Sequence, residues 1–241
     1  MILKSNKVYD HAECPPLPVL TRTNVDGRRH YVTPEGTFIS ITSLLSWLQP
    51  SDSIKSWRDR VGNDVADYIM QTAGRRGTRL HKIVELALSN KPLGEITDHG
   101  LLPTALFNMM QPALDRISQI RALEQPLYST EFSIGIAGQA DTVCEFDGIP
   151  SVVDFKTATK MREEEEIQNH LIQCAFYASA WTRQTQLPIK QIVIIMASED
   201  GRMHVFKKSP SAYIPKLWEL AGHYVLAGIA KQDAAKRGKD W

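Results

Sequence analysis

The stretch that most constrains the fold of this chain is Gly138–Lys156, GQADTVCEFDGIPSVVDFK. Asp147-Gly148 is a strong signal for a two-residue hairpin turn, because both residues tolerate positive φ angles. With these two residues as the loop, Phe146 pairs with Ile149. Every further pair follows by counting outward, so the sequence predicts a β-hairpin of defined register.

Three charged side chains converge in this hairpin. The register puts Asp141 opposite Asp154, and Gln139 opposite Lys156. Alternate residues of a strand share a face, so Asp154 and Lys156 lie on the same side of the sheet. Directly opposite residues also share a face, with Cβ atoms about 5 Å apart. The hairpin is therefore expected to bring two carboxylates and one ammonium group to the same place.

Two carboxylates at that distance destabilise the sheet unless a cation neutralises them. They repel each other and raise each other's pKa. A divalent cation removes the repulsion, and carboxylate oxygens are hard ligands that suit Mg²⁺ or Mn²⁺ better than zinc. The alternative is a solvated hairpin face that carries an ordinary Lys–Asp pair.

Composition fits an ordinary globular protein and narrows the class. The 241 residues carry a net charge of +1, so the whole-chain charge gives no sign of a polyanionic partner. No run of about 18 apolar residues occurs, which predicts no membrane span. Residues 1–16 lack the apolar core of a signal peptide and make a poor transit peptide.

The cysteines indicate a reducing compartment. Cys14, Cys144 and Cys174 are too few and too widely spaced for a disulfide framework or a metal knuckle. Cys144 and Cys174 fall within predicted elements and are expected in the core. We therefore expect a cytoplasmic protein, in the host cytoplasm if the source is viral.

The order of the remaining patterns predicts an α+β fold in a single domain. Apolar periodicity and turn signals give the following elements. The first half is predicted to contain a small β region over 18–40 and helices over 42–48, about 54–69 and 103–123. Between these helices we predict a break at 74–78, with Thr78 as the N-cap of a helix to 88. The second half is predicted to contain a strand over 128–135, the hairpin, a helix over 162–184, strands over 191–198 and 202–208, and a helix from 210 to about 232.

This order suggests four regions within the single domain of residues 1–241. Residues 1–37 form an N-terminal β extension, and residues 38–125 form a helical cap. Residues 126–232 form the catalytic core, and residues 233–241 form a basic tail.

Two helices carry polar pairs with a spacing of four residues. His81 and Glu85 stand on one side of their predicted helix, and so do Gln173 and Tyr177 on theirs. A His/Glu pair at this spacing is, taken alone, most often a surface pair. Tyr177 has an equally simple alternative, as a packed core residue.

Together these motifs resemble a known family. Their order along the chain is His81-x-x-x-Glu85, Gly138-x-x-Asp141, Asp154-x-Lys156 and Gln173-x-x-x-Tyr177. The chain resembles the PD-(D/E)XK nuclease superfamily in its RecB-like branch, closest to the mitochondrial genome maintenance exonucleases and related phage exonucleases. The strings SITSLL, RGTRLHKIVE, DFKTATK and NHLIQCAFYASA add to the likeness, which covers about residues 38–185. Ala140 stands where the superfamily name has Pro.

The resemblance implies a restriction-endonuclease-like core, a mixed sheet flanked by helices, with an N-terminal helical cap. It also implies one or two Mg²⁺ or Mn²⁺ ions. Lys156 would position the attacking water and stabilise the charge of the transition state. The branch with an iron–sulfur cluster needs four cysteines, so no such cluster is expected. The implied metal ligands are Asp141, Asp154, Glu85, the backbone carbonyl of Phe155 and, as a further candidate, His81.

A second set of residues is expected to contact DNA. Basic residues at the predicted N-terminus of the His81 helix would track phosphates, because that helix end favours anions. Any one of them could instead be a solvated surface residue. The set consists of Gln173, Tyr177, Arg75, Arg76, Arg79, Lys82, Thr157 and Lys160. Aromatic residues of the cap that could stack on bases, or else belong to the core, are Trp47, Trp57, Tyr68 and Phe107.

The hypothesis that follows is a metal-dependent DNA exonuclease that favours single-stranded or end-exposed DNA. A structure-specific or restriction-like endonuclease is the alternative within enzymes. A catalytically silent DNA-binding protein is the alternative from another class, and the presence of both aspartates, Glu85 and Lys156 argues against it. The polarity of digestion, the choice between DNA and RNA, and the oligomeric state, a monomer included, remain open.

Overall fold

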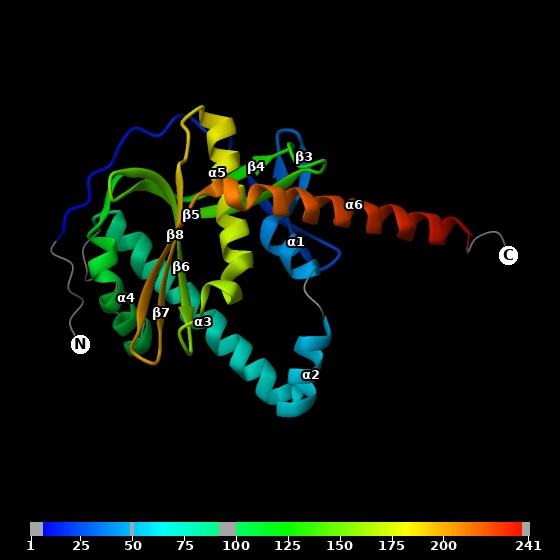
Figure 1. Cartoon of the computed structure of the whole chain (residues 1–241), viewed down its shortest axis with the longest axis horizontal. Helices are drawn as coiled ribbons and strands as arrows, with labels where there is room; N and C mark the ends of the chain where they lie inside the picture. Colours follow the sequence, from blue (N-terminus) through cyan, green and yellow to red (C-terminus); the bar gives the residue numbers. More distant parts are fainter. Residues whose placement is uncertain (1–6, 49–50, 92–99, 238–241) are drawn as a thin grey trace.

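A mixed β-sheet with helices on both faces forms the centre of the molecule (Figure 1), which confirms the predicted α+β class. The computed structural model describes residues 7–48, 51–91 and 100–237. The strands are β1 Thr21–Val25, β2 Arg28–Thr33, β3 Gly36–Ser40, β4 Ile117–Ser129, β5 Ile136–Phe146, β6 Ile149–Ala158, β7 Gln191–Ser198 and β8 Met203–Lys208. The helices are α1 Ile41–Leu48, α2 Ser51–Val61, α3 Asn63–Leu88, α4 Leu101–Leu114, α5 Gln168–Thr185 and α6 Ile214–Arg237, with 3-10 turns η2 Glu164–Ile167 and η3 Pro210–Ala212.

Strand β7 separates two apolar layers. Ile192, Ile194 and Met196 face the core formed with α1, α5 and α6. Val193 and Ile195 face the core formed with α3 and α4. Figure 1 shows α4 and α5 on opposite sides of this part of the sheet. The continuous apolar sequence of β7 follows from this position, because a strand covered on both faces needs no polar side.

The predicted small β region and the last two strands are present where expected. Strands β1, β2 and β3 form an antiparallel unit over residues 21–40. A two-residue turn at Asp26-Gly27 joins the first two of these strands, and both residues have positive φ. Strands β6 and β7 run parallel, joined by α5, and β8 is antiparallel to β7.

The hairpin of β5 and β6 has the predicted turn and register. Asp147 and Gly148 have φ angles of 55° and 73° and form the loop. Residues 142–146 pair with residues 149–153 in the expected antiparallel order. The turn chemistry alone was sufficient for this part of the prediction, because a two-residue loop leaves no freedom in the register.

Beyond that point the two strands separate, and the predicted pairing of Gln139 with Lys156 is wrong. Gln139 pairs only with Pro126 of β4. Asp141 reaches β6 through its side chain, since its Oδ2 accepts a hydrogen bond of 3.0 Å from the Phe155 N–H.

The separation has a physical cause in the sheet. Strand β4 covers one edge of β5 along its length. The other edge pairs with β6 at residues 142–146 and with β3 at residues 136–137. Residues 138–141 lie between these partners and have no strand neighbour on that edge. The sheet is therefore open beside Asp141.

The predicted break at residues 74–78 is also wrong. Helix α3 runs without interruption from Asn63 to Leu88, so Thr78 caps nothing. The chain instead turns at Gly62, whose φ is 87°. Gly costs about 1 kcal/mol in a helix interior, which is too little to end a helix that buries a long apolar stripe. The positive end of the helix dipole consequently lies near Asn63, far along the helix from His81.

The segment predicted as a helix over 103–123 divides into a helix and a strand. Helix α4 ends at Leu114, and β4 begins at Ile117. Ile117 and Ile120 are buried, so tertiary pairing with β5 overrides the helical spacing. Of the strand predicted over 128–135, only Tyr128 and Ser129 belong to β4, because the chain turns after Ser129 to pair β5 with β4. The segment 38–125 thus supplies β3 and β4 to the sheet as well as helices.

Two later helices differ from prediction only at their ends. The acidic start, Glu163 to Glu166, forms a 3-10 turn with a capping box, and α5 itself begins at Gln168. Helix α6 continues to Arg237 and extends away from the body of the molecule (Figure 1). Cys144 and Cys174 are buried, as predicted.

Helix α2 and the first half of α3 stand away from the sheet (Figure 1). Tyr68 in this arm is 71% exposed, whereas Phe107 on α4 is fully buried in the core. The stacking candidates of the predicted cap therefore differ in exposure: Tyr68 is accessible to a base, whereas the burial of Phe107 excludes contact with a ligand. Within the described residues, no helix combines the length and apolarity needed to cross a membrane.

The two glycines Gly138 and Gly74 make a matched test of this architecture. A Cβ at Gly138 would lie 2.7 Å from Tyr177 Cε1 and 2.9 Å from Ile41 Cγ2, whereas one at Gly74 meets nothing within 4 Å. We expect Gly138→Ala to lower the free energy of unfolding by roughly 1–3 kcal/mol through overpacking. Gly74→Ala should raise it by about 0.5–1 kcal/mol, because Ala favours a helix interior. Chemical denaturation measures both, and a destabilised Gly74→Ala variant would contradict the continuous helix.

Candidate active site

Four of the predicted site residues, three predicted to be catalytic and one a candidate metal ligand, meet at the open edge of β5. Asp141 comes from β5, Asp154 and Lys156 come from β6, and His81 comes from the second half of α3. They are joined by short polar contacts and surrounded by the two apolar cores. The fold therefore assembles this group from three separate elements.

Asp154 is a buried carboxylate with one charged neighbour. Its side chain is 2% exposed, and its Oδ2 lies 2.5 Å from the Lys156 Nζ. Apart from this ammonium group, neither carboxylate oxygen has a polar partner among the described residues. Burial raises the pKa of Asp154, Lys156 acts against that shift, and the charge of Asp141 adds to it. Such a group is costly to keep charged without a further partner.

Lys156 keeps its positive charge in this setting. Burial alone would favour the neutral amine, but the carboxylates of Asp154 and Asp141 raise the pKa of Lys156 well above its ordinary value. The ammonium group is held at the site with 20% of its side chain exposed. It is thus available as a fixed positive charge.

Asp141 and His81 form a second polar pair around the backbone of Phe155. The His81 Nε2 lies 2.8 Å from the Phe155 carbonyl oxygen, and the His81 Nδ1 lies 3.4 Å from Asp141 Oδ2. Burial favours a neutral ring, but Asp141 outweighs it and raises the pKa of His81 to about 9. Burial also opposes ionisation of Asp141, yet His81 and Lys156 together lower its pKa.

Glu124 belongs to the same cluster, and the sequence analysis missed it. It lies on β4 between the pairs Leu123–Thr142 and Gln125–Ala140, which puts it level with Asp141 on the neighbouring strand. Ligand atoms of His81, Glu124 and Asp141 all lie within 4.8 Å of one another. Burial first, and then the charge of Asp141, raise the pKa of Glu124 to about 7.

The reason for the omission is the misassigned strand. Residues 117–123 carry helical spacing, which predicts a helix that ends just before Glu124. The register of β4 against β5 would have shown a carboxylate opposite Asp141, but that register depends on an irregularity between Ser118 and Ala122. The predicted pairing of Asp141 with Asp154 is therefore wrong, because the register of β5 and β6 ends at Thr142 and Val153. The carboxylate level with Asp141 on a neighbouring strand is Glu124 of β4.

Glu85 lies at the margin of this group. Its carboxylate accepts a hydrogen bond of 2.9 Å from the Lys82 Nζ and is one-third exposed. Its charge contributes to the raised pKa of Glu124, so it is close enough to act on the cluster. Lys82 is engaged by this contact.

Arg76 does not face solvent. It forms an ion pair with Glu199, and its Nε donates a hydrogen bond of 3.1 Å to Thr157 Oγ1. With 8% of its side chain exposed, it connects α3 to the ends of β6 and β7. Its guanidinium is therefore already used within the protein. The basic residues that do face solvent near it are Arg75, Arg79 and Lys160.

Gln173 and Tyr177 lie together on α5. The Gln173 Nε2 donates a hydrogen bond of 2.9 Å to the Tyr177 hydroxyl. Tyr177 is buried, and its ring packs directly on Gly138. This packing explains the glycine three residues before Asp141, since any side chain there would collide with the ring. Tyr177 thus supports the site from within the core.

A model of the PD-(D/E)XK nuclease superfamily matches residues 58–237. The match includes all four motifs and most of the chain. The chain belongs to the PD-(D/E)XK nuclease superfamily. The resemblance inferred from the motifs is confirmed at this level.

The individual proteins that the chain resembles share little of its sequence. The human mitochondrial genome maintenance exonuclease 1 is 26% identical over 173 residues, which cover 67% of this chain and 49% of that protein. The nuclease chain thus spans about half the length of this curated relative. A solved structure of a candidate exonuclease from Eubacterium rectale is 14% identical, has a TM-score of 0.38, and covers 63% of this chain and 68% of its own. A TM-score this low does not establish a shared fold.

Nucleases of this superfamily use divalent metal ions, and the residues present fit such an ion. The carboxylate of Asp154 is buried with Lys156 as its one polar partner among the described residues, so a second cation could bind its remaining oxygen lone pairs. Asp141, Glu124 and His81 supply further ligand atoms in one cluster. A donor set dominated by carboxylate oxygens is suited to a hard cation.

Glu124→Gln tests whether this carboxylate is part of the metal site. We expect the variant to bind Mn²⁺ about tenfold more weakly in calorimetric titrations without DNA, because outer ligands and supports of a site change metal affinity by roughly 10- to 100-fold. Glu131→Gln is the control, since Glu131 accepts its hydrogen bond from Ser179. Equal Mn²⁺ affinity of both variants and the unaltered protein would exclude Glu124 from the site.

Proposed function

We propose that this nuclease is a metal-dependent DNA exonuclease that hydrolyses phosphodiester bonds in single-stranded or end-exposed DNA. The observation that carries the proposal is the buried carboxylate of Asp154, which has Lys156 as its one charged partner and lies beside Asp141. A structural core would gain stability from an apolar residue at this position. The buried charges are suited to binding a cation and a phosphate.

In this proposal Asp141 and Asp154 hold the metal, with Glu124 as an additional ligand from β4. The Phe155 carbonyl and Glu85 are the further candidates named from the sequence. When bound, Mg²⁺ or Mn²⁺ would acidify a water molecule and neutralise charge on the scissile phosphate. His81 holds the Phe155 carbonyl by a hydrogen bond and orients Asp141, which supports the role of a positioning residue or a further ligand.

Lys156 supplies a fixed positive charge next to the phosphate. Its raised pKa keeps it protonated at neutral pH. A preorganised cation stabilises the extra negative charge of the transition state without rearrangement. It would also orient the attacking water. The role is that of an electrostatic stabiliser rather than a general base.

The DNA backbone would pass along the exposed basic residues of α3 and the β6 end. Arg75 and Arg79 face solvent on α3, and Lys160 follows β6. Gln173 and Lys82 remain candidates for phosphate contact, although each has a partner within the protein. Arg76, Thr157 and Tyr177 act in this proposal as supports of the site.

Asp154→Asn tests the site assignment. The change keeps the shape of the side chain and removes the charge that would bind the cation, so cleavage should fall by at least roughly 10²- to 10³-fold. The measurement is release of labelled nucleotides from linear single-stranded DNA with Mn²⁺ or Mg²⁺, compared with chelator. DNA binding, measured by anisotropy, should persist. Full activity in this variant would remove Asp154 from the metal site.

Circular DNA separates the exonuclease from an endonuclease. The human relative is named an exonuclease, which favours the same activity here. We expect linear single strands to be degraded and covalently closed single-stranded circles of the same sequence to persist. Circles degraded as fast as linear strands would favour the endonuclease, and intact substrates of both kinds would favour a silent DNA-binding protein.

A further inference from the structure

A basic groove that shares no residue with the candidate active site lies between the β1–β2 hairpin and α1. Its volume is about 830 Å³. No acidic residue is among those that line it. They are Arg22, Thr23, Asn24, Gly27, Arg28, Arg29, Thr42, Ser43, Ser46 and Trp47.

The three arginines of this groove are free to bind an anion. Other basic side chains of the protein, such as Arg76 and Arg116, are paired with carboxylates. Within the described residues, Arg22, Arg28 and Arg29 form no ion pair. By register, Arg22 and Arg29 share one face of the β1–β2 hairpin, and Arg28 borders the groove from the other face. Guanidinium groups without a carboxylate partner, beside hydroxyl groups on the opposite wall, are the chemistry that recognises phosphate oxygens.

Trp47 adds an aromatic surface to the same groove. Its ring is half-buried and rests edge-on against Tyr224 of α6, with ring centroids 5.0 Å apart. The contact holds the indole in place while part of it borders the groove. A fixed aromatic ring beside guanidinium groups can stack on an unpaired base, which a duplex does not offer.

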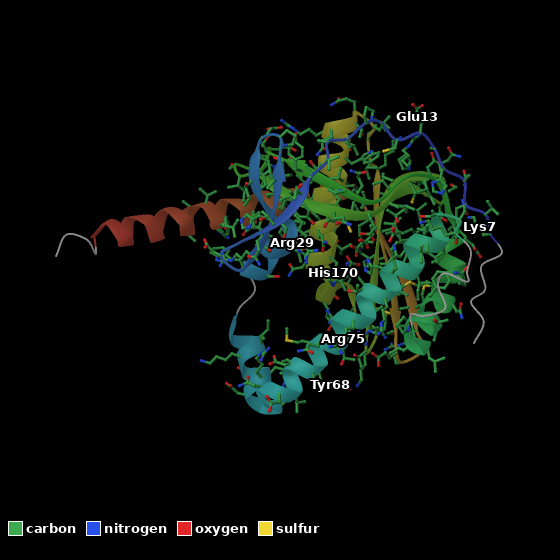
Figure 2. All side chains as sticks on the ribbon, turned by 180° about the vertical axis from the view of Figure 1, so that it is seen from behind. Lys7, Glu13, Arg29, Tyr68, Arg75 and His170 are labelled. Carbon is green, nitrogen blue, oxygen red and sulfur yellow. The ribbon has the colours of Figure 1, made fainter. Side chains whose placement is uncertain are left out.

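The groove is physically connected to the active site through α1. Ile41, the first residue of α1, packs on Gly138, which precedes Asp141 by three residues on β5. The buried side of α1 thus contacts the catalytic strand, and Thr42 and Ser46 on its other side line the groove. Figure 2 shows Arg29 on the side of this region nearest to α3, where Arg75 is labelled.

We propose that this groove binds single-stranded DNA a few nucleotides away from the bond that is cut. The inference rests on the proposed function, because it assigns a second contact region to the same substrate. The groove holds the strand through phosphates on Arg22, Arg28 and Arg29 and through a base on Trp47. It therefore makes affinity depend on the length of the strand.

The test compares binding of oligothymidylates of about 4 and about 20 nucleotides in the presence of chelator, measured by anisotropy. The variant Arg22→Ala/Arg28→Ala/Arg29→Ala should lose most of the preference for the longer strand, with binding of that strand weakened roughly tenfold or more. Its dependence of log affinity on log salt should also become shallower by about 2, since each phosphate contact contributes roughly 0.7.

A matched control removes the same charge elsewhere. Arg183, Lys190 and Lys216 lie on α5, before β7 and on α6, and the triple change to Ala should keep the length preference. Trp47→Phe, which retains an aromatic ring, should bind the longer strand more tightly than Trp47→Leu. Thermal melting of every variant verifies that it is folded.

Several results would overturn the proposal. Unchanged length preference in the arginine variant excludes the groove, and equal loss in both triple variants reduces the effect to overall charge. If thymidine monophosphate displaces the long strand as effectively as a short oligonucleotide does, the groove is a mononucleotide site. An equal loss for blunt duplex DNA would exclude single-strand recognition. Binding is measured without metal, so it does not depend on cleavage. If the protein cuts no DNA, the proposed function is wrong, but the groove can still be tested by binding.

Discussion

The interaction on which the site depends is the burial of Asp154 beside Lys156. A carboxylate taken out of water without hydrogen bonds is strongly disfavoured, and a single ammonium group does not satisfy both of its oxygens. The surrounding sheet and helices hold it there because their apolar cores supply the stability that the charge removes. The chemical capacity of the site thus arises from a local arrangement that the rest of the fold has to support.

The sheet provides the support by changing partners along β5. One edge of this strand passes from β6 to β3, and the residues between them, 138–141, face an opening instead of a strand. Asp141 can therefore use its side chain to bind the Phe155 N–H and meet His81 from α3. At the same opening α1 lies against β5, since Ile41 packs on Gly138, and α1 thus contacts both the candidate site's strand and the basic groove.

Much of this arrangement was predictable from local sequence. The Asp147-Gly148 turn defined the register of the hairpin, and the four motifs indicated the nuclease superfamily, to which the chain belongs. What failed were patterns that tertiary contacts override. Residues 117–123 carry helical spacing but pair with β5, and Gly74 lies inside a continuous helix. Both errors affected the predicted site. Because of the first, Glu124 was not recognised as a site residue, and because of the second, a helix N-terminus was predicted near His81 that the structure has near Asn63.

The sequence by itself determined the residue types of the site, the tight turn that aligns two strands, and the apolar runs that must be buried. These features depend only on residues that are close to one another in the sequence. Only the tertiary structure decided which charges meet. Glu124 faces Asp141, Arg76 is consumed by Glu199, and the free arginines gather beside α1. Such contacts join distant segments, and their geometry follows from how whole layers pack rather than from any local preference.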